Sequence, residues 1–334
     1  MVKLHIYNLD IQVVIKMSDI KIAILDAATL GQDIDLSVFN SLGKVDIYDL
    51  TPMDCIKERI SDCEVCVINK VKLSGEVLCH ARNLKLICVA ATGYDNIDTE
   101  YCKENGIALC NVAGYSVNSV SQLTVAMVLS ASVNLPAFRD SVASGRYSAG
   151  NVQNILTPVY HEIAGKTWGI IGYGQIGKKV GDVAKALGCR VIVNKRTPIE
   201  NEECVSLDEI LERSDIISIH TPLTDETRNL IGEAEIEKMK DGVVLINVAR
   251  GAVTNENDVA KAIERGKIGF FGCDVYSTEP MPVNHPFYPI RNFENVCLTP
   301  HMAWGAFESR SRCINEICLN IEAFFKGEKR NRIV

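Results

Sequence analysis

Three polar residues each follow a short apolar run in the last third of the sequence. Arg250 comes just after GVVLINV, Glu279 just after GFFGCDV, and His301 just after ENVCL. If these runs are strands of one open α/β sheet, the three side chains lie at the edge where such sheets bind ligands. A histidine beside a carboxylate is a general acid whose charged form is stabilised, and an arginine can hold a carboxylate and polarise a carbonyl.

Each of the three also has a structural explanation when it is taken alone. Arg250 is then a surface residue, Glu279 a turn residue before a proline, and His301 a histidine with satisfied hydrogen bonds after Pro300. Their shared position at strand ends favours the catalytic interpretation.

A glycine pattern precedes this group in the chain. WGIIGYGQIGKKVG fits G-x-G-x-x-G at Gly172, Gly174 and Gly177, after an expected strand and before a helix that ends at Leu187-Gly188. In that context the first glycine permits a tight turn, the second lets backbone approach a pyrophosphate, and the third lets the helix pack on the strand. Because a helix N-terminus offers free N–H groups to phosphates, the pattern predicts a dinucleotide-binding site.

The acidic residue that usually follows such a loop by about 20 residues is missing. VIVNKRTP places Lys195 and Arg196 at the end of the second strand, with no acid from Asn194 to Pro198. An acid there accepts hydrogen bonds from the ribose hydroxyls and repels a 2′-phosphate, whereas Arg196 is suited to bind that phosphate bidentately and Lys195 as a point charge. We therefore expect NADP to be preferred. In the alternative, both side chains point to solvent, Asn194 or a backbone group holds the ribose, and NAD is usable.

Apolar runs that alternate with helical patterns organise the chain into two series. The first comprises KIAIL, KVDIY, EVCVI, LKLICVA and IALCN, and the second TWGIIG, CRVIVN, DIISIH, GVVLINV, GFFGCDV and ENVCLTP. Such runs, spaced by helices, predict parallel sheets buried on both faces. An uncharged helix, roughly Val117 to Val133, lies between the series, and a helical stretch from about Ala303 to Lys326 closes the chain. The prediction is an α/β fold with two doubly wound, Rossmann-like domains and a cleft between them.

Composition limits the class of protein. The 334 residues are about right for two domains, and 47% hydrophobic with 23% charged residues indicates a globular chain. The formal net charge of −7 argues against nucleic acid or an anionic membrane as the main partner. The longest uncharged stretch, from Asn105 to Phe138, has a dense apolar part that is too short to cross a bilayer.

The 13 cysteines, mostly inside apolar runs, indicate buried thiols in a reducing compartment, and hence a cytoplasmic protein. Cys63 and Cys66 form a lone CxxC with nothing to complete a zinc site, so no metal is expected. The first 16 residues lack the apolar core of a signal peptide, and Met17 precedes the first expected strand. Residues 1–16 are therefore interpreted as an extension outside the fold or an upstream start.

Several motifs in order resemble one family. ATGYDNID, GYSVNSVSQLTVAM, WGIIGYGQIG, HTPLTDETRNLI, INVARG, CDVYSTEP and LTPHMAW together resemble the NAD(P)-dependent D-2-hydroxyacid dehydrogenases over about residues 20–330. Within that family, ATGY, Gln122 and HMAW are most similar to glycerate dehydrogenases, also called hydroxypyruvate reductases. Formate dehydrogenases carry glutamine where Glu279 stands, and phosphoglycerate dehydrogenases often carry a regulatory domain for which this chain has no room.

The resemblance implies a fold and a set of site residues. It implies a flavodoxin-like substrate domain from residues 17–115 and 303–334, a dinucleotide-binding domain from residues 116–302, and a homodimer joined through the latter. Arg250, Glu279 and His301 would be catalytic, and the backbone of Thr92 and Gly93 would bind the substrate carboxylate. Asp274 would face the nicotinamide amide. Besides the glycines, Lys195 and Arg196, the residues expected to line the dinucleotide are Thr124, Gln175, Ile176, His220, Thr221, Pro222, Val248 and Ala249.

The expected reaction is the reversible reduction of hydroxypyruvate or glyoxylate to D-glycerate or glycolate. By resemblance, Lys70 in INK and Trp304 in HMAW line the substrate pocket. Lys70 is otherwise a solvated surface lysine, and Trp304 otherwise packs between domains. Two alternatives stay open: a bulkier apolar 2-keto acid as the substrate, or a dinucleotide-sensing binding protein like the family's corepressor branch, which would bind cofactor and turn over hydroxypyruvate poorly.

Overall fold

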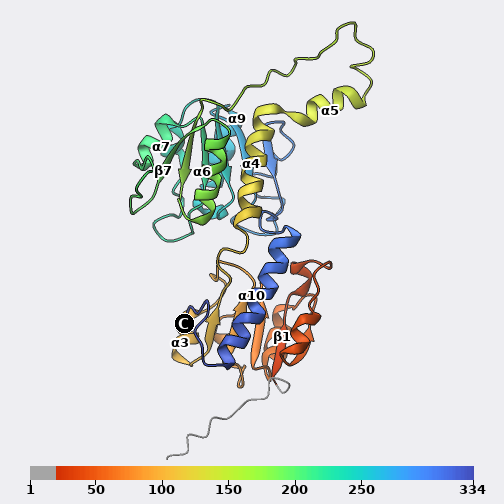
Figure 1. Cartoon of the computed structure of the whole chain (residues 1–334), viewed down its shortest axis with the longest axis vertical. Helices are drawn as coiled ribbons and strands as arrows, with labels where there is room; N and C mark the ends of the chain where they lie inside the picture. Colours follow the sequence, from red (N-terminus) through yellow and green to blue (C-terminus); the bar gives the residue numbers. More distant parts are fainter. Residues whose placement is uncertain (1–19) are drawn as a thin grey trace, which may run out of the picture. The chain divides into compact units, whose positions relative to one another are not determined.

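A computed structural model describes residues 20–334, which divide into two compact units (Figure 1). The first unit contains the described residues up to Tyr115 together with Phe307–Val334, and the second contains Ser116–Ala306. The predicted extension, residues 1–16, lies outside the described residues. Residues 303–306 lie in the second unit, whereas the sequence predicts them in the first. The N–H of Ala303 donates to Asp274, and the Ser119 hydroxyl bonds to Ala303 and Ala306, so this segment is held by residues of the second unit.

The first unit is built on a five-stranded sheet in the order β2-β1-β3-β4-β5, in which all neighbouring strands are parallel. Every residue of β3 and β4 is buried, as expected of apolar runs that are covered on both faces. Helices α1, α2 and α3 contribute to one apolar cluster beside the sheet, and α10 packs against β4. The elements are β1 (Lys21–Ile24), η2 (Ala27–Leu30), η3 (Ser37–Ser41), β2 (Lys44–Ile47), η4 (Met53–Cys55), α1 (Ile56–Ile60), β3 (Val65–Ile68), α2 (Gly75–Leu78), β4 (Leu86–Val89), α3 (Thr99–Glu104), β5 (Ala108–Cys110) and α10 (Phe307–Phe325).

The second unit is built on a six-stranded parallel sheet in the order β11-β10-β9-β8-β6-β7. Helices α4 and α6 contribute to the apolar cluster on one face, and α7, α8 and α9 to the cluster on the other. The elements are α4 (Val117–Val133), α5 (Leu135–Ala143), β6 (Thr167–Ile171), α6 (Gln175–Ala186), β7 (Arg190–Asn194), α7 (Leu207–Arg213), β8 (Ile216–Ile219), α8 (Glu233–Lys238), β9 (Val243–Asn247), η5 (Gly251–Val253), α9 (Glu256–Glu264), β10 (Ile268–Cys273) and β11 (Val296–Leu298).

Local sequence signals account for several helix boundaries. Ser206 and Glu209 form a reciprocal capping box at the start of α7, and the side chain of Asn255 caps α9. Helix α4 ends at Asn134, which adopts a left-handed conformation with φ of 48°. These signals fix where the strand-connecting helices begin and end, and so which residues remain in the loops at the sheet edge.

The predicted fold class is confirmed: each of the eleven apolar runs contains a strand, and both sheets are parallel. The last helix begins at Phe307 and not near Ala303, because the N–H groups of Met302 and Ala303 donate to the Asp274 carboxylate instead of entering a helix. Among the described residues, no single helix is long and apolar enough to cross a membrane, although the bent pair α4 and α5 passes by length and composition together. The apolar side chains of α4 that are buried, such as Met127 and Val128, pack in the core of the second unit.

Candidate active site

Arg250, Glu279 and His301 follow three adjacent strands of the second unit. β9, β10 and β11 are neighbours in the sheet and run parallel, so their carboxyl ends meet at one edge. Arg250 lies three residues beyond β9, and Glu279 and His301 lie in the segments that follow β10 and β11. The sheet thus brings the predicted catalytic residues to the same edge, as parallel topology requires.

His301 and Glu279 are in direct contact. Nδ1 of His301 lies 2.6 Å from Oε2 of Glu279, with 24% of the His301 side chain and 30% of the Glu279 side chain exposed. Oε1 of Glu279 accepts a hydrogen bond from the N–H of Tyr276 at 3.0 Å, which holds the carboxylate in place. Nε2 of His301 makes no hydrogen bond to any residue from 20 to 334. When Nδ1–H is donated to the carboxylate, Nε2 is the nitrogen that can exchange a proton with a ligand.

The backbone around His301 is held by Asp274. His301 has φ of 51°, a left-handed conformation that a non-glycine residue adopts at a cost. Oδ1 of Asp274 accepts hydrogen bonds from the Thr299 hydroxyl (2.6 Å) and the Met302 N–H (2.8 Å), and Oδ2 accepts one from the Ala303 N–H (2.9 Å). Burial raises the pKa of Asp274, and these three hydrogen bonds act in the opposite direction. Asp274 is 0% exposed, and its carboxylate shapes the segment that carries His301; its contact with the nicotinamide amide stays a prediction.

Arg250 is partly exposed on a turn that Asn247 shapes. The buried Asn247 side chain donates to the carbonyl of Arg250 (3.0 Å) and accepts from the N–H of Ala249 (3.0 Å). The guanidinium of Arg250 donates to the carbonyl of Ala249 at 2.9 Å. Val248 is buried and Ala249 is partly exposed. The turn therefore presents Arg250 and Ala249, rather than Val248, to a ligand.

The glycine-rich loop has the geometry of a phosphate-binding turn. Gly172 has φ of 89°, and a Cβ there would lie 2.6 Å from the Thr221 backbone nitrogen, so only glycine fits. A Cβ on Gly177 would lie 2.3 Å from the Gly172 carbonyl oxygen, which explains the close packing of α6 on β6. A Cβ on Gly174 would meet no atom within 4 Å, so this backbone faces open space. Gln175 is exposed and Ile176 partly exposed in the first turn of α6, whose first N–H groups have no partner within the helix. The loop therefore fits the pyrophosphate of a dinucleotide.

The end of β7 carries the two cations in place of an acid. Lys195 and Arg196 are exposed, and Arg196 Nη1 lies 3.7 Å from Oε2 of Glu226 in the segment after β8. The side-chain amide of Asn194 donates to the carbonyl of Val205 at 3.1 Å, and the backbone carbonyl of Asn194 accepts the N–H of Gly172 at 3.0 Å. Asn194 thus ties the strand end to the glycine loop, and its side-chain oxygen remains without a donor among the described residues.

The segment after β8 combines exposed and buried polar groups. His220 and Thr221 are partly exposed and Pro222 is exposed. Nδ1 of His220 is buried without a hydrogen-bond partner in the described part of the chain, and burial lowers the pKa of His220 to about 3. An unpartnered buried nitrogen that stays neutral is a feature that a bound ligand can complete. Thr124 of α4 is 0% exposed, and its hydroxyl donates to the carbonyl of Val120 at 2.9 Å; its place beside the dinucleotide stays a prediction.

The predicted carboxylate-binding residues lie in the first unit, after β4. The N–H groups of Thr92 and Gly93 have no acceptor within residues 20–334, and the Thr92 hydroxyl donates to the carbonyl of Val112 at 3.0 Å. Lys70 is exposed on the turn after β3, whose N–H groups donate to the buried carboxylate of Asp26. Two adjacent open N–H groups are suited to bind an anion.

Trp304 lies in the second unit. Its indole N–H donates to the carbonyl of His301 at 3.0 Å, and its ring packs against the apolar cluster around α4 and α6. The side chain therefore supports the His301 segment from behind.

Sequence reasoning missed four residues behind this edge: Tyr276, Glu256, His285 and Ser218. Tyr276 donates its phenol to the carbonyl of Thr299 at 2.9 Å, and so links the Glu279 segment to the His301 segment. Ser218 accepts the Trp168 indole N–H at 2.9 Å and contacts Nε2 of His220 at 3.1 Å. No local signal identifies such residues, because each acts on a partner that is distant in the sequence. The short sequences around Tyr276 (Asp-Val-Tyr) and His285 (His-Pro) match no motif that would predict a role in the site.

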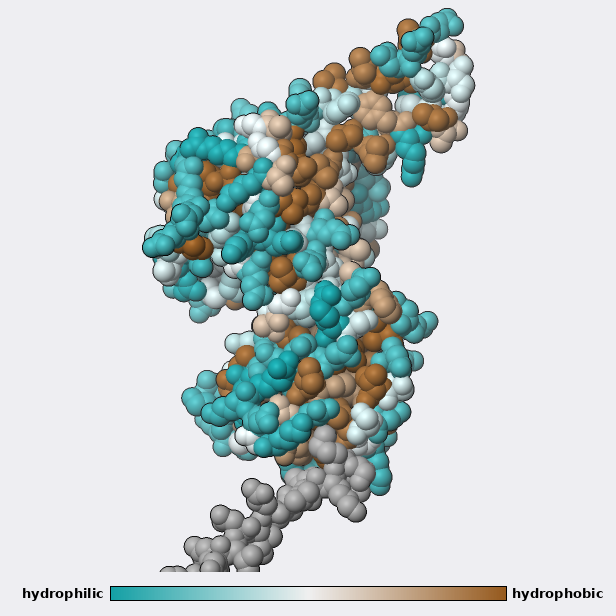
Figure 2. Space-filling view, viewed as in Figure 1, coloured by the Kyte–Doolittle hydropathy of each residue, from teal (hydrophilic) through white to brown (hydrophobic). Residues whose placement is uncertain are grey.

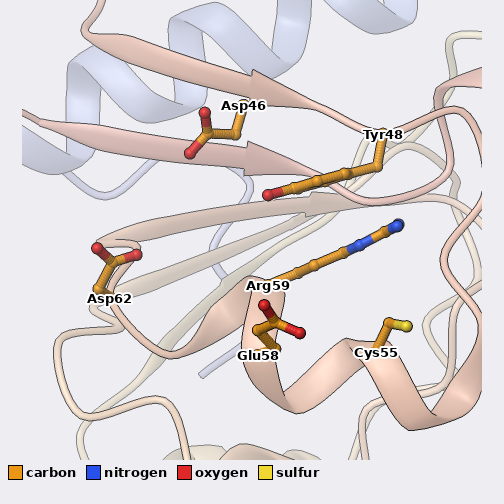
Figure 3. A pocket seen from close by; sticks show the side chains of 6 residues that line it. All are labelled: Asp46, Tyr48, Cys55, Glu58, Arg59 and Asp62. Carbon is orange, nitrogen blue, oxygen red and sulfur yellow. The ribbon is translucent and has the colours of Figure 1, made fainter.

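Figure 3 shows a cavity of about 340 Å³ in the first unit, lined by Asp46, Tyr48, Cys55, Glu58, Arg59 and Asp62. None of the predicted site residues lines it. Arg59 lies over the Tyr48 ring, 4.0 Å from its centroid, and donates to Leu50 and Thr51, so this guanidinium is already engaged.

The cysteines are all unpaired, and most are buried. The pKa of Cys66 is raised by its contact with Cys63 and by burial, which keeps the thiol protonated and unreactive. No group of three or more histidine, cysteine or acidic side chains in residues 20–334 is arranged to hold a metal ion.

Comparison with known proteins places this geometry in context. Residues 125–303 match the family described as D-isomer specific 2-hydroxyacid dehydrogenase, NAD binding domain. A hydroxypyruvate reductase from Blautia hydrogenotrophica is 36% identical over 93% of this chain and 98% of its own, and a glycerate dehydrogenase from Methylorubrum extorquens is 34% identical over the same shares. Among solved structures, an acyclic imino acid reductase in complex with NADPH and D-Arg is similar, with a TM-score of 0.83 and 26% identity over 94% of this chain and 100% of its own.

Proposed function

The chain belongs to the D-isomer specific 2-hydroxyacid dehydrogenases, and from that premise we propose that it reduces hydroxypyruvate or glyoxylate to D-glycerate or glycolate. The observation that carries the proposal is the His301–Glu279 contact of 2.6 Å at the sheet edge that also presents Arg250. The names of relatives support the substrate: hydroxypyruvate reductase, glycerate dehydrogenase and glyoxylate reductase.

The side chains have distinct tasks in this reaction. A reduced nicotinamide, when bound, supplies the hydride for the carbonyl carbon. His301 gives a proton from Nε2 to the carbonyl oxygen, and Glu279 orients the ring through Nδ1. Arg250 binds the substrate carboxylate and stabilises charge that develops on the oxygen. The open N–H groups of Thr92 and Gly93 are the second carboxylate-binding element, and in the reverse direction His301 is the base.

The substrate test is a panel of 2-keto acids assayed with NADH and with NADPH. We expect hydroxypyruvate or glyoxylate to give the highest kcat/KM, because Lys70 and the polar N–H groups suit a small polar acid. A clear preference for a bulky apolar keto acid would overturn the substrate assignment. Dinucleotide binding without turnover of any member of the panel would favour the dinucleotide-sensing alternative.

The catalytic test is His301→Ala. Turnover should fall by about 10² or more, the usual worth of a positioned acid or base, while the Kd for dinucleotide measured by fluorescence stays within about twofold. A loss of turnover below about tenfold contradicts the role of His301. His80→Ala, which changes an exposed histidine of the first unit, is the matched control.

We also propose that NADPH is preferred over NADH. Lys195 and Arg196 are exposed at the end of β7, and no acid of that segment stands where it would repel a 2′-phosphate. A charge-assisted hydrogen bond of about 1.5–3 kcal/mol is enough for tenfold preference. Replacing both residues by alanine should remove the preference, mainly through the KM for NADPH. A parent enzyme that works better with NADH contradicts the proposal.

The assembly we propose is a homodimer through the dinucleotide-binding unit, in the cytoplasm. Helix α5 and the segment after it project from the sheet and helices of the second unit (Figure 1). They expose apolar side chains, which appear as brown patches on the projection in Figure 2: Leu135, Val142, Val152, Leu156 and Val159 are 60–75% exposed. Such a surface is typical of an interface. Sedimentation of Leu156→Asp with Val159→Asp should give a monomer, whereas a parent that sediments as a monomer contradicts the proposal.

A further inference from the structure

A buried acid lies behind the segment that carries Glu279. Glu256, the first residue of α9, is only 8% exposed. Its Oε1 accepts the N–H of Ser277 at 2.7 Å, and its Oε2 accepts the hydroxyl of Ser277. Ser277 stands two residues before Glu279, so this carboxylate holds both the backbone and the side chain of the segment that aims Glu279 at His301.

A buried histidine completes the arrangement. Nε2 of His285 lies 3.0 Å from Oε2 of Glu256, and 3% of the His285 side chain is exposed. Nδ1 of His285 accepts the N–H of Phe287 at 3.1 Å, so the ring proton is on Nε2 and faces the carboxylate. The Nε2–H is not aligned for a hydrogen bond, and the contact is mainly electrostatic. The His285 ring also packs edge-on against Tyr276, with centroids 5.6 Å apart.

The same segment is packed tightly on its other side. A Cβ on Gly251 would lie 2.1 Å from the carbonyl carbon of Tyr276 and 2.3 Å from the nitrogen of Ser277. The backbone next to Arg250 therefore touches the backbone next to Glu279. With Glu256 on Ser277 and glycine at position 251, the segment has little freedom to shift.

A buried carboxylate adds little net stability, because its desolvation cost offsets the contacts it makes. Such a carboxylate can still matter for catalysis by fixing positions, because a general acid and its orienting carboxylate must hold their geometry to about 0.5 Å. Among the described residues, the carboxylate of Glu256 forms hydrogen bonds to Ser277 and an ion-pair contact with His285, and it forms neither with His301 nor with Glu279. We propose that Glu256 is a positioning residue for the reaction, which acts through Ser277 to hold Glu279 against Nδ1 of His301. This inference rests on the proposed function.

The test variant is Glu256→Gln, which keeps the shape of the side chain. Three donors, the Ser277 N–H, the Ser277 hydroxyl and the His285 Nε2–H, face the carboxylate, and a glutamine offers one oxygen and one NH₂ group to them. One donor is then left facing another donor, so the Ser277 segment should shift. Asp258→Asn, on the same helix, is the matched control, because the Asp258 carboxylate accepts the N–H of Glu233 at 3.2 Å and no hydrogen bond from Ser277, Glu279 or His301 in the described part of the chain.

The first readout does not need a substrate. The ¹⁵N chemical shifts of the His301 ring, assigned with His301→Gln, report which nitrogen carries the proton in the neutral ring. In the parent, Glu279 favours the proton on Nδ1. Glu256→Gln should move these shifts part of the way toward those of Glu279→Gln, the double variant should match Glu279→Gln alone, and Asp258→Asn should match the parent. Shifts in Glu256→Gln that equal those of the parent would overturn the proposal.

The second readout is turnover in the same set of variants. Glu256→Gln should lower kcat by about tenfold or more with the dinucleotide Kd within twofold, and should cause no further loss in the Glu279→Gln background. Losses that multiply in the double variant mean a general structural role and overturn the proposal. A parent that reduces no 2-keto acid would contradict the proposed function alone, because the ring shifts still decide whether Glu256 positions Glu279.

Discussion

The two units have the same strand order around their first strand, yet they treat the loop after that strand in opposite ways. β1 lies between β2 and β3, and β6 lies between β7 and β8, so both sheets have a switch point where ligands usually bind. After β6 the chain places Gly172 with φ of 89°, exposes the backbone of Gly174 and starts a 12-residue helix. Within residues 20–334, the N–H groups of Gly174, Gln175 and Ile176 have no acceptor and remain open to an anion.

In the first unit an acid of the chain itself occupies the equivalent loop. After β1 comes Asp26, 3% exposed, followed by only a short 3-10 helix. The Asp26 carboxylate accepts the N–H groups of Asn69 (2.9 Å), Lys70 and Val71 (3.0 Å) in the turn after β3. The loop after β1 also has its own N–H groups occupied, because Ala27 and Ala28 donate to the carbonyls of Tyr48 and Asp49. The comparison teaches that topology alone does not make a dinucleotide site: a strand-end loop binds a phosphate only where the protein has not already taken its N–H donors.

The largest effect is expected from Asp26→Ala. Three buried or partly buried N–H groups lose their acceptor, which should lower the free energy of unfolding by about 3 kcal/mol. Urea denaturation measures this loss, and Asp35→Ala, an exposed aspartate of the same unit, is the control. The Kd for dinucleotide should stay unchanged, because the glycine loop lies in the other unit. A parallel loss of dinucleotide affinity would mean that the two loops are not independent.

A substitution in the glycine loop should have the opposite pair of effects: dinucleotide affinity should fall while the free energy of unfolding stays nearly unchanged. A Cβ on Gly174 meets nothing within 4 Å, so Gly174→Ala should change the free energy of unfolding by less than about 1 kcal/mol. It fills the space through which a pyrophosphate approaches, so the Kd for dinucleotide should rise about tenfold or more. Gly177→Ala is the contrasting variant, because its Cβ would lie 2.3 Å from the Gly172 oxygen and should destabilise the fold. Unchanged dinucleotide binding by Gly174→Ala would remove this loop from the site.

The sequence predicted both sheets because strands buried on two faces are short apolar runs whatever surrounds them. The glycine spacing and the residues after strand ends were equally readable, because a parallel sheet brings strand ends together without knowledge of side-chain contacts. The His301–Glu279 contact follows from this reasoning, although its 2.6 Å geometry does not.

The remaining features depend on partners that only the folded chain brings together. The hydrogen bonds of the Asp274 carboxylate to Thr299, Met302 and Ala303 join residues that are 25, 28 and 29 positions apart in the sequence. The contacts of Glu256 with Ser277 and His285 cross similar separations. Local periodicity carries no information about such pairs, because it reports which face of an element is apolar and not which polar atoms meet.

The pH dependence of stability should also separate the two units. Burial lowers the folded-state pKa of His220 in the second unit to about 3, below its ordinary value of 6.5. Below pH 6.5, His220 takes up a proton in the unfolded chain but not in the folded chain. The contribution of neutral His220 to the free energy of unfolding is therefore complete above pH 6.5 and is lost as the pH falls toward 3. The expected slope is up to about 1.4 kcal/mol per pH unit. Urea denaturation between pH 7 and 5 should show a shallower slope for His220→Asn, whereas His80→Asn, at an exposed histidine of the first unit, should follow the parent. Equal slopes for parent and His220→Asn would contradict the burial argument.

The smallest effect is expected from Glu226, an acid of the second unit that lies near Arg196 at the end of β7. Glu226 lies 3.7 Å from Arg196, with side chains 77% and 85% exposed, so the second unit contains a weak version of what Asp26 does in the first. Because an exposed ion pair is worth little, a 2′-phosphate should displace Glu226 from Arg196 easily. Glu226→Gln should therefore lower the KM for NADPH by no more than about fivefold and leave that for NADH unchanged. Asp225→Asn, the exposed neighbour, controls for the loss of one negative charge. A higher KM for NADPH in Glu226→Gln would mean that Glu226 holds Arg196 ready for the phosphate rather than competing with it, and an equal change for both dinucleotides would mean that Arg196 does not contact the 2′-phosphate.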